Sequence, residues 1–208
     1  GLDRLKEMPE MSIHELNKNL SIDLNDDEPF IVMIQHVISS EYQDGYFQMN
    51  ETLKALDVLG FKSLIIYPNF DPGSEKLIEA LHLYKDVDHF YIKQNLPRLE
   101  FVNLLRKASC LIGNSSAGIL ESSFLKLPVV NIGNRQKGRL HAENVEFTKH
   151  DSNLIQEAIK KALFDEKYKS IVKNCTNPYG NGDSSIKIAN ILDQTEINKE
   201  FSIKDISY

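Results

Sequence analysis

The chain has 208 residues, of which 41% are hydrophobic and 26% are charged, and its formal net charge at pH 7 is -6. This composition is that of an ordinary globular protein and excludes a fibrous or low-complexity chain. The acidic balance argues against a nucleic-acid-binding surface, and no apolar run approaches the ~18 residues that a membrane-spanning helix needs. We therefore expect a cytoplasmic protein with no nucleic-acid or membrane partner.

The cysteines and the N-terminal residues indicate which kinds of site and segment the chain lacks. Cys110 and Cys175 are the only cysteines, and neither lies in a CxxC pair. The sequence therefore gives no case for a zinc site or a disulfide framework, and we expect no metal and no cofactor. The charged N-terminal segment has no signal-peptide core. The chain begins with Gly1 rather than Met, so we expect a piece of a longer protein.

Strand-like and helix-like patterns alternate along most of the chain. A short helix over residues 12–20 comes first, within a lead-in segment of residues 1–28. Short apolar runs rich in β-branched residues then predict buried parallel strands, and apolar residues at helical spacing predict helices between them. The predicted strands are residues 29–36, 63–68, 89–93, 109–113 and 128–132. The predicted helices are residues 41–59, 72–84, 98–108 and 117–126.

The order of these elements predicts the fold class. Strands joined through helices by short connections imply right-handed crossovers. The chain should therefore be an α/β protein with a Rossmann-like parallel sheet that carries helices on both faces. Gly60 is placed to end the first long helix, and Ser74 is placed to cap the next one.

The C-terminal part of the chain has a different pattern. Residues 152–172 predict one or two helices. A loop over residues 177–185 follows, in which Asp183 or Ser184 is placed to cap a last helix. The tail of residues 193–208 mixes charged and apolar groups without a clear period, so we expect an extended or frayed end.

Three unusual segments lie at predicted strand ends, where an open parallel sheet binds its ligands. His36 and the polar residues 39–41 follow the first strand. The segment "GNSSAG", residues 113–118, follows the fourth strand. The segment "GNRQKGR", residues 133–139, follows the fifth and carries three positive charges. These segments should face a common crevice.

The small residues Gly113, Asn114, Ser115 and Ser116 are compatible with an anion site. Glycine lets the backbone approach a ligand, and the N–H groups of the next helix together with two hydroxyls can bind a phosphate. The segment lacks the GK[ST] ending of a Walker motif and has no GxGxxG. By itself it is more often a plain strand-to-helix turn with a serine cap. The positive charges at the next strand end favour the anion site.

Three further residues allow two interpretations each. Glu121 lies in an otherwise apolar segment, where it is either a partner for the helix dipole or an acceptor for vicinal hydroxyls. His36 is either an ordinary buried histidine, the more frequent case, or a phosphate contact with a proton-transfer role. Arg135 is either part of a solvated charge run or a phosphate ligand, which its position after a strand end favours.

Several blocks of this sequence resemble the UDP-N-acetylglucosamine 2-epimerase family, in particular its hydrolysing branch. The resemblance runs from about Gly1 to about Leu192. In "IQHVISSEY", Val37 replaces the proline usual in the corresponding family block, which puts the loop after His36 in doubt. The other blocks are "GNSSAGILE", "PVVNIGNRQKGR", "AENV", "IYPNFDPGS" and "NPYGNGDSS".

The resemblance implies the C-terminal half of a two-domain fold of the glycosyltransferase-B type. The family removes the C2 proton of the sugar and expels UDP, and water or UDP then adds back with inverted C2. The product would be N-acetylmannosamine or a related amino sugar. The implied partners are a UDP-amino sugar, an N-terminal domain of the same enzyme that supplies the proton-moving carboxylates, and further copies in a homo-oligomer.

Site residues follow from the same resemblance. Ser115 and Ser116 would hold the diphosphate, Glu121 the ribose hydroxyls, and Arg135 a phosphate. His36 would be the catalytic residue that neutralises or protonates the leaving diphosphate. The ring of Phe101 would border uracil, whose edge the backbone of residues 94–96 would read. The complete set implied for UDP binding is Gly113, Asn114, Ser115, Ser116, Glu121, Arg135 and Phe101.

Two other functions remain open from the sequence. The chain could be the donor-nucleotide domain of a retaining glycosyltransferase, although the segment "RQKGR" argues against this class. It could also be a UDP-sugar-binding module without catalysis. A reading frame of this length that begins with Met would favour the module, and a longer frame that continues upstream would favour the enzyme.

Overall fold

The computed structural model describes residues 1–196, so most of the predicted frayed tail lies outside the described residues. The chain separates into two compact units. The larger unit is Pro9–Tyr179, and the smaller one joins Gly1–Met8 to the segment that begins at Gly180.

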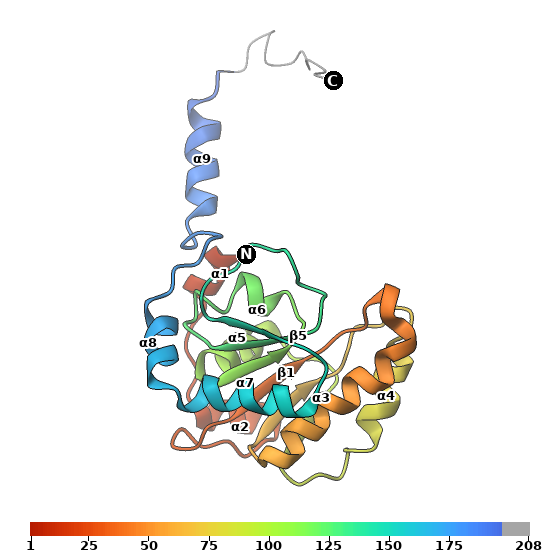
Figure 1. Cartoon of the computed structure of the whole chain (residues 1–208). Helices are drawn as coiled ribbons and strands as arrows, with labels where there is room; N and C mark the ends of the chain where they lie inside the picture. The colour runs from red at the N-terminus through yellow and green to blue at the C-terminus, as the bar shows by residue number, and fades with distance from the viewer. Residues whose placement is uncertain (197–208) are drawn as a thin grey trace. The chain divides into compact units, whose positions relative to one another are not determined.

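The larger unit is built on a six-stranded sheet with the order β3-β2-β1-β4-β5-β6 (Figure 1). All neighbouring strands pair in parallel, as the sequence predicts. The strands are β1 Ile31–Ile34, β2 Ser63–Ile66, β3 Phe90–Lys93, β4 Cys110–Gly113, β5 Val129–Ile132 and β6 Val145–Thr148. The prediction of five strands missed β6. Within residues 1–196 this edge strand pairs only with β5, and its sequence "VEFT" is no apolar run.

Helices cover both faces of the sheet, which confirms the predicted layers (Figure 1). Side chains alternate along each strand, so Ile31 and Met33 point to one face while Val32 and Ile34 point to the other. The first face packs against α3 Gly45–Leu59, α4 Ser74–His82, α7 Ser152–Phe164 and α8 Glu166–Asn174. The second packs against α2 Ile13–Leu20, α5 Arg98–Lys107 and α6 Ala117–Leu120.

Three predicted helix starts and ends change in the structure. The helix expected from Glu41 begins only at Gly45, because a 3₁₀ helix, Ser39–Asp44, precedes it. Ser74 is the first residue of α4 rather than its cap, and Gly73 takes the N-cap position at φ 93°. The predicted helix 117–126 is reduced to the single turn of α6. Gly60 does end α3, at φ 69°, and Ser12 caps α2 with a capping box.

The smaller unit contains α1 Leu2–Glu7 and α9 Ser184–Gln194. Asp183 occupies the N-cap position of α9, but its side chain makes no capping hydrogen bond. The carboxylate of Asp3 accepts the N–H groups of Ser184 at 3.3 Å and Ser185 at 2.6 Å instead. Hydrogen bonds from the side chain and backbone of Ser185 lower the pKa of Asp3. The cap of this helix is therefore supplied from the other end of the chain.

In the part of the chain that the structure describes, no helix is both long and apolar enough to cross a membrane.

Candidate functional site

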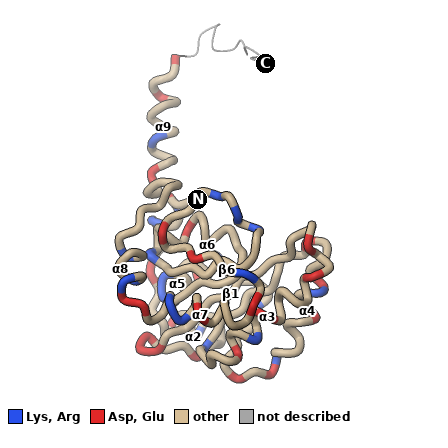
Figure 2. The backbone as a smooth tube through the Cα atoms, in the orientation of Figure 1, with Lys and Arg blue, Asp and Glu red and all other residues tan. Residues whose placement is uncertain are grey.

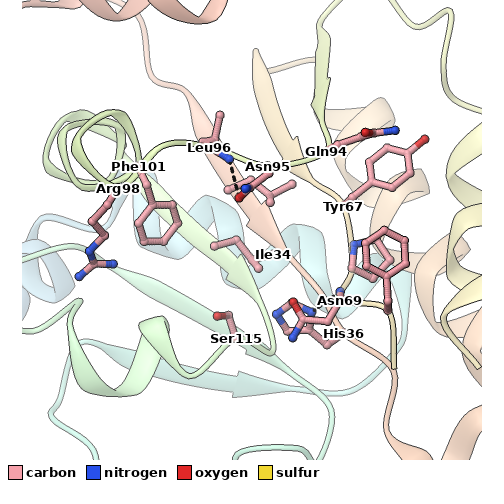
Figure 3. A pocket seen from close by; sticks show the side chains of 13 residues that line it. Ile34, His36, Tyr67, Asn69, Gln94, Asn95, Leu96, Arg98, Phe101 and Ser115 are labelled. Atoms are coloured by element: carbon pink, nitrogen blue, oxygen red, sulfur yellow. Dashed lines mark hydrogen bonds between the residues drawn. The ribbon is translucent and has the colours of Figure 1, made fainter. Parts of the chain in front are cut away.

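A cavity of about 670 Å³ opens at the carboxyl ends of β1, β2, β3 and β4. The chain order reverses between β1 and β4, and such a switch point is where open α/β sheets bind ligands. Among the predicted residues, His36, Phe101, Ser115 and the segment 94–96 line this cavity (Figure 3). The lining also includes Tyr67, Asn69, Phe70 and Arg98, which the sequence analysis did not single out.

Gly113 and Asn114 hold the ends of β1 and β4 together. Gly113 has φ 115°, and a Cβ there would lie 2.1 Å from the carbonyl oxygen of Ile34. The fully buried side chain of Asn114 accepts the N–H of His36 through Oδ1 at 2.7 Å and donates through Nδ2 to the carbonyl of His36 at 2.9 Å. Both polar groups of Asn114 are thus engaged within the protein. Together these contacts fix the backbone beside the cavity.

His36 is a buried imidazole whose pKa lies well below its ordinary value. Burial and then the nearby charge of Arg135 lower the pKa of His36 to about 4, against an opposing effect of Asp71. The N–H of Asn69 donates to Nδ1 at 3.2 Å, so Nδ1 is an acceptor and the proton of the neutral ring is on Nε2. His36 therefore brings one N–H donor to the cavity.

We expect the stability of the chain to fall as the pH is lowered from about 6.5 toward 4. Burial lowers the pKa of His36 and of His150 in the folded state. As the pH falls, the unfolded chain therefore binds protons before the folded chain does, and this proton binding stabilises the unfolded state. His36 alone accounts for a loss on the order of 3 kcal/mol across this range. Urea unfolding at pH 7 and pH 4.5 measures it.

The matched variant for this measurement is His36→Gln, which cannot titrate. Its unfolding free energy should depend less on pH than that of the original chain. Equal pH dependence in both proteins would contradict the assignment of His36 as a buried neutral group.

The anion site predicted after β4 consists of the free N–H groups of the Ser115–Ser116 turn, and no long helix follows this turn. Because α6 has only four residues, its dipole contributes little, and the predicted helix-end anion site is reduced to the turn itself. The Oγ of Ser115 accepts the N–H of Ala117 at 3.3 Å. Within residues 1–196, the N–H groups of Ser115 and Ser116 donate to no protein acceptor. These two donors suit an anionic ligand.

The loop after β5 contains Arg135, Lys137 and Arg139, which are among the Lys and Arg positions coloured blue in Figure 2. Arg135 donates through Nη1 to the carbonyl of Asn114 at 3.1 Å. Gln136 is buried and donates to the same carbonyl at 2.8 Å, while its Oε1 accepts Nη1 of Arg139 at 3.0 Å. Gln136 was missed because an uncharged residue inside a basic run gives no signal in the sequence. It ties the charged loop to the "GNSS" turn.

Glu121 caps the C-terminal end of α6 and is paired with Arg98. The Nη2 of Arg98 lies 3.1 Å and 3.2 Å from the two carboxylate oxygens of Glu121. Its guanidinium carbon lies 5.5 Å from the ring centroid of Phe101. Glu121 was expected one turn inside a helix, and the structure places it at the helix end instead. Neither Glu121 nor Arg135 is among the lining residues of the cavity.

The loop 94–96 uses part of its hydrogen-bonding capacity internally. Oδ1 of Asn95 accepts the N–H of Leu96 at 2.9 Å (Figure 3). The backbone N–H of Leu96 is therefore engaged in this structure and would have to exchange partners to contact a base. The carbonyl groups of the loop remain the simpler choice for reading a base edge.

No group of three or more His, Cys, Asp or Glu residues is arranged to hold a metal ion within residues 1–196.

The doubly wound sheet with a cavity at its switch point defines a domain of the Rossmann-like α/β class. The family model for UDP-N-acetylglucosamine 2-epimerase matches residues 1–193. The chain belongs to this family, which confirms the resemblance found in the sequence.

Individual relatives agree with this assignment. The chain is 26% identical over its whole length to UDP-N,N'-diacetylbacillosamine 2-epimerase (hydrolyzing) of Legionella pneumophila, and it covers 53% of that protein. It is 33% identical over 144 residues, 68% of the chain and 37% of the relative, to GDP/UDP-N,N'-diacetylbacillosamine 2-epimerase (hydrolyzing) of Campylobacter jejuni. The chain thus spans about half the length of the curated relatives it matches, or less.

A solved structure shares the fold. UDP-GlcNAc 2-epimerase of Neisseria meningitidis, determined with UDP-GlcNAc bound, matches 93% of this chain and is itself covered to 53%, with a TM-score of 0.72 and 18% identity. At this identity the match supports the architecture of the domain.

Proposed function

We propose that this chain is the UDP-binding half of a hydrolysing UDP-N-acetylglucosamine 2-epimerase. The observation that carries the proposal is the meeting of His36, the Ser115–Ser116 turn and Arg135 at the carboxyl ends of β1 and β4. The names of the relatives support the substrate class, a UDP-linked N-acetylated amino sugar. The complete enzyme would invert C2, release UDP and add water to give N-acetylmannosamine or a related amino sugar.

In this proposal each group of the site has one task. The free N–H groups and hydroxyls of Ser115 and Ser116 bind the diphosphate, and Arg135 neutralises part of its charge. Glu121 accepts hydrogen bonds from the ribose hydroxyls. The ring of Phe101 packs beside uracil. Gly113 and Asn114 act through the backbone by holding the turn against β1.

His36 assists departure of UDP through its Nε2–H. The leaving diphosphate oxygen gains negative charge as the C1–O bond breaks, and a donor aimed at that oxygen stabilises the transition state more than the ground state. The approaching diphosphate also favours the protonated imidazole, which raises the pKa of His36 from its value in the free chain. His36 can then deliver a proton to the leaving oxygen. The carboxylates that move the C2 proton would come from the N-terminal half, and assembly into a homo-oligomer belongs to the same proposal.

The proposal predicts separate losses for two variants in titration calorimetry with UDP and uridine. Arg135→Ala should weaken UDP binding at least tenfold and leave uridine binding nearly unchanged, because only UDP carries the diphosphate. Glu121→Ala should weaken both ligands, since charge-assisted hydrogen bonds to hydroxyls contribute on the order of 1.5–3 kcal/mol. UDP affinity of the unchanged chain should fall with added salt.

Lys160→Ala is the matched control. It also removes one positive charge, but Lys160 is an exposed residue of α7 that does not line the cavity. It should bind both ligands like the original chain. Failure of the unchanged chain to bind UDP at millimolar concentration would overturn the proposed function. Normal binding of both ligands by both site variants would show that UDP sits elsewhere.

A further inference from the structure

Arg98 stands out as a cavity residue to which the proposed function gives no task. It is the first residue of α5 and comes directly after Pro97, so the fixed φ of proline helps to set where its side chain begins. Figure 3 shows Arg98 and Phe101 extending from the same helix beside the cavity. The two residues are one helical turn apart, which is the spacing at which side chains meet on a helix surface.

The contact between Arg98 and Glu121 has a specific geometry. A single nitrogen, Nη2, lies 3.1 Å and 3.2 Å from the two oxygens of the carboxylate. A carboxylate offers about four lone-pair positions, so this one donor leaves positions open on both oxygens. Glu121 can therefore stay paired with Arg98 and still accept two further hydrogen bonds. Vicinal hydroxyls of a ribose require that combination.

The pair also fixes the side chain of Glu121. Glu121 follows a single helical turn, and its carboxylate makes its hydrogen bonds within residues 1–196 only with Arg98. A free glutamate side chain would lose up to about 2 kcal/mol of rotamer entropy on binding a ligand. Arg98 imposes this order beforehand, and Phe101 in turn supports Arg98, with the guanidinium carbon 5.5 Å from the ring centroid.

Charge gives Arg98 a second effect. An unpaired carboxylate beside the diphosphate position would repel the ligand that it is meant to bind. The adjacent guanidinium offsets that repulsion, and only 21% of the Glu121 side chain is exposed to solvent that could screen it.

We infer that Arg98 is a positioning residue that orients Glu121 toward the ribose and so makes the site select a ribonucleoside diphosphate over its 2′-deoxy analogue. The inference rests on the proposed function, because it assumes that Glu121 contacts the ribose. It goes further by assigning the sugar selectivity of the nucleotide to a contact between α5 and the end of α6.

The test compares the affinities of UDP and 2′-deoxy-UDP by titration calorimetry. The unchanged chain should prefer UDP by roughly tenfold, the effect of one hydrogen bond to a charged group. Arg98→Ala should reduce the preference to less than about threefold, because Glu121 then no longer holds its orientation. Arg98→Lys should keep most of it, since an ammonium group can still pair with the carboxylate. Glu121→Gln should reduce the preference as far as Arg98→Ala does.

Lys107→Ala provides the control on the same helix. It removes an ion pair with Asp26, 3.6 Å long, away from the cavity, and should leave the preference at its original value. A purely structural contribution of Arg98 would weaken both ligands equally and leave their ratio unchanged.

The outcomes separate the inference from the proposed function. If Arg98→Ala weakens neither ligand, or weakens both by the same factor, the inference is overturned while the proposed function stands. If the unchanged chain binds neither ligand, the proposed function and the inference fail together. A preference that disappears in Arg98→Ala and persists in Arg98→Lys and Lys107→Ala supports the inference.

Discussion

Replacing Gly113 by alanine is expected to lower the free energy of unfolding by at least about 3 kcal/mol. The added Cβ would lie 2.1 Å from the carbonyl oxygen of Ile34 and 2.6 Å from its carbonyl carbon. Both are backbone atoms of β1, which pairs with β2 and β4 in the centre of the sheet, so they cannot move aside cheaply. The residue also has φ 115°, which alanine rarely adopts. Urea unfolding followed by circular dichroism measures the loss.

Gly60→Ala separates the clash from the cost of positive φ. Gly60 has φ 69°, and a Cβ there would meet no atom within 4 Å. This variant should lose only about 1–2 kcal/mol. Equal losses of unfolding free energy in Gly113→Ala and Gly60→Ala would contradict the close approach of Gly113 to the carbonyl group of Ile34. Because the same contact places the Ser115–Ser116 turn, a folded Gly113→Ala protein should also bind UDP less tightly.

The second large effect is expected from His36→Ala in a full-length enzyme that contains this chain and reaches the length of its relatives. Its kcat should fall by roughly 10²–10⁴, the range for a group that donates or accepts a proton in the transition state. The affinity for UDP should fall much less, because Ser115, Ser116 and Arg135 still bind the diphosphate. Release of UDP from UDP-N-acetylglucosamine, followed over a range of substrate concentrations, separates kcat from KM.

His36→Gln shows which chemistry the imidazole performs. Glutamine keeps a neutral N–H donor but cannot transfer a proton at this position. A kcat as low as that of the alanine variant would indicate proton delivery to the leaving oxygen. A kcat within about tenfold of the original would indicate that a neutral hydrogen bond is sufficient. A normal kcat in His36→Ala, with weakened UDP binding alone, would contradict any role of His36 in the chemical step.

The order of strands and helices could be predicted from the sequence because it depends on local patterns. Buried parallel strands are short apolar runs, and the helices between them have their own period. Parallel strands also point the same way, so residues that follow different strands must gather at one edge. For this reason the sequence predicts that His36, the "GNSSAG" segment and the "GNRQKGR" segment lie at one edge of the sheet, and Arg135 and Gln136 do donate to the carbonyl of Asn114. The edge strand β6 escaped because its polar residues break the apolar pattern.

The properties of the site depend on contacts between residues far apart in the chain, which no local pattern reports. The fold buries His36 and brings Arg135 nearby, which lowers the pKa of the imidazole, and Oδ1 of Asn114, 78 residues away in sequence, accepts its backbone N–H. Glu121 is held by Arg98, although nothing in either segment of sequence indicates the pairing. Local sequence determines which residues reach the carboxyl edge of the sheet. Their charge, orientation and free hydrogen-bonding groups are decided by tertiary packing, because burial and ionic neighbours exist only in the folded chain.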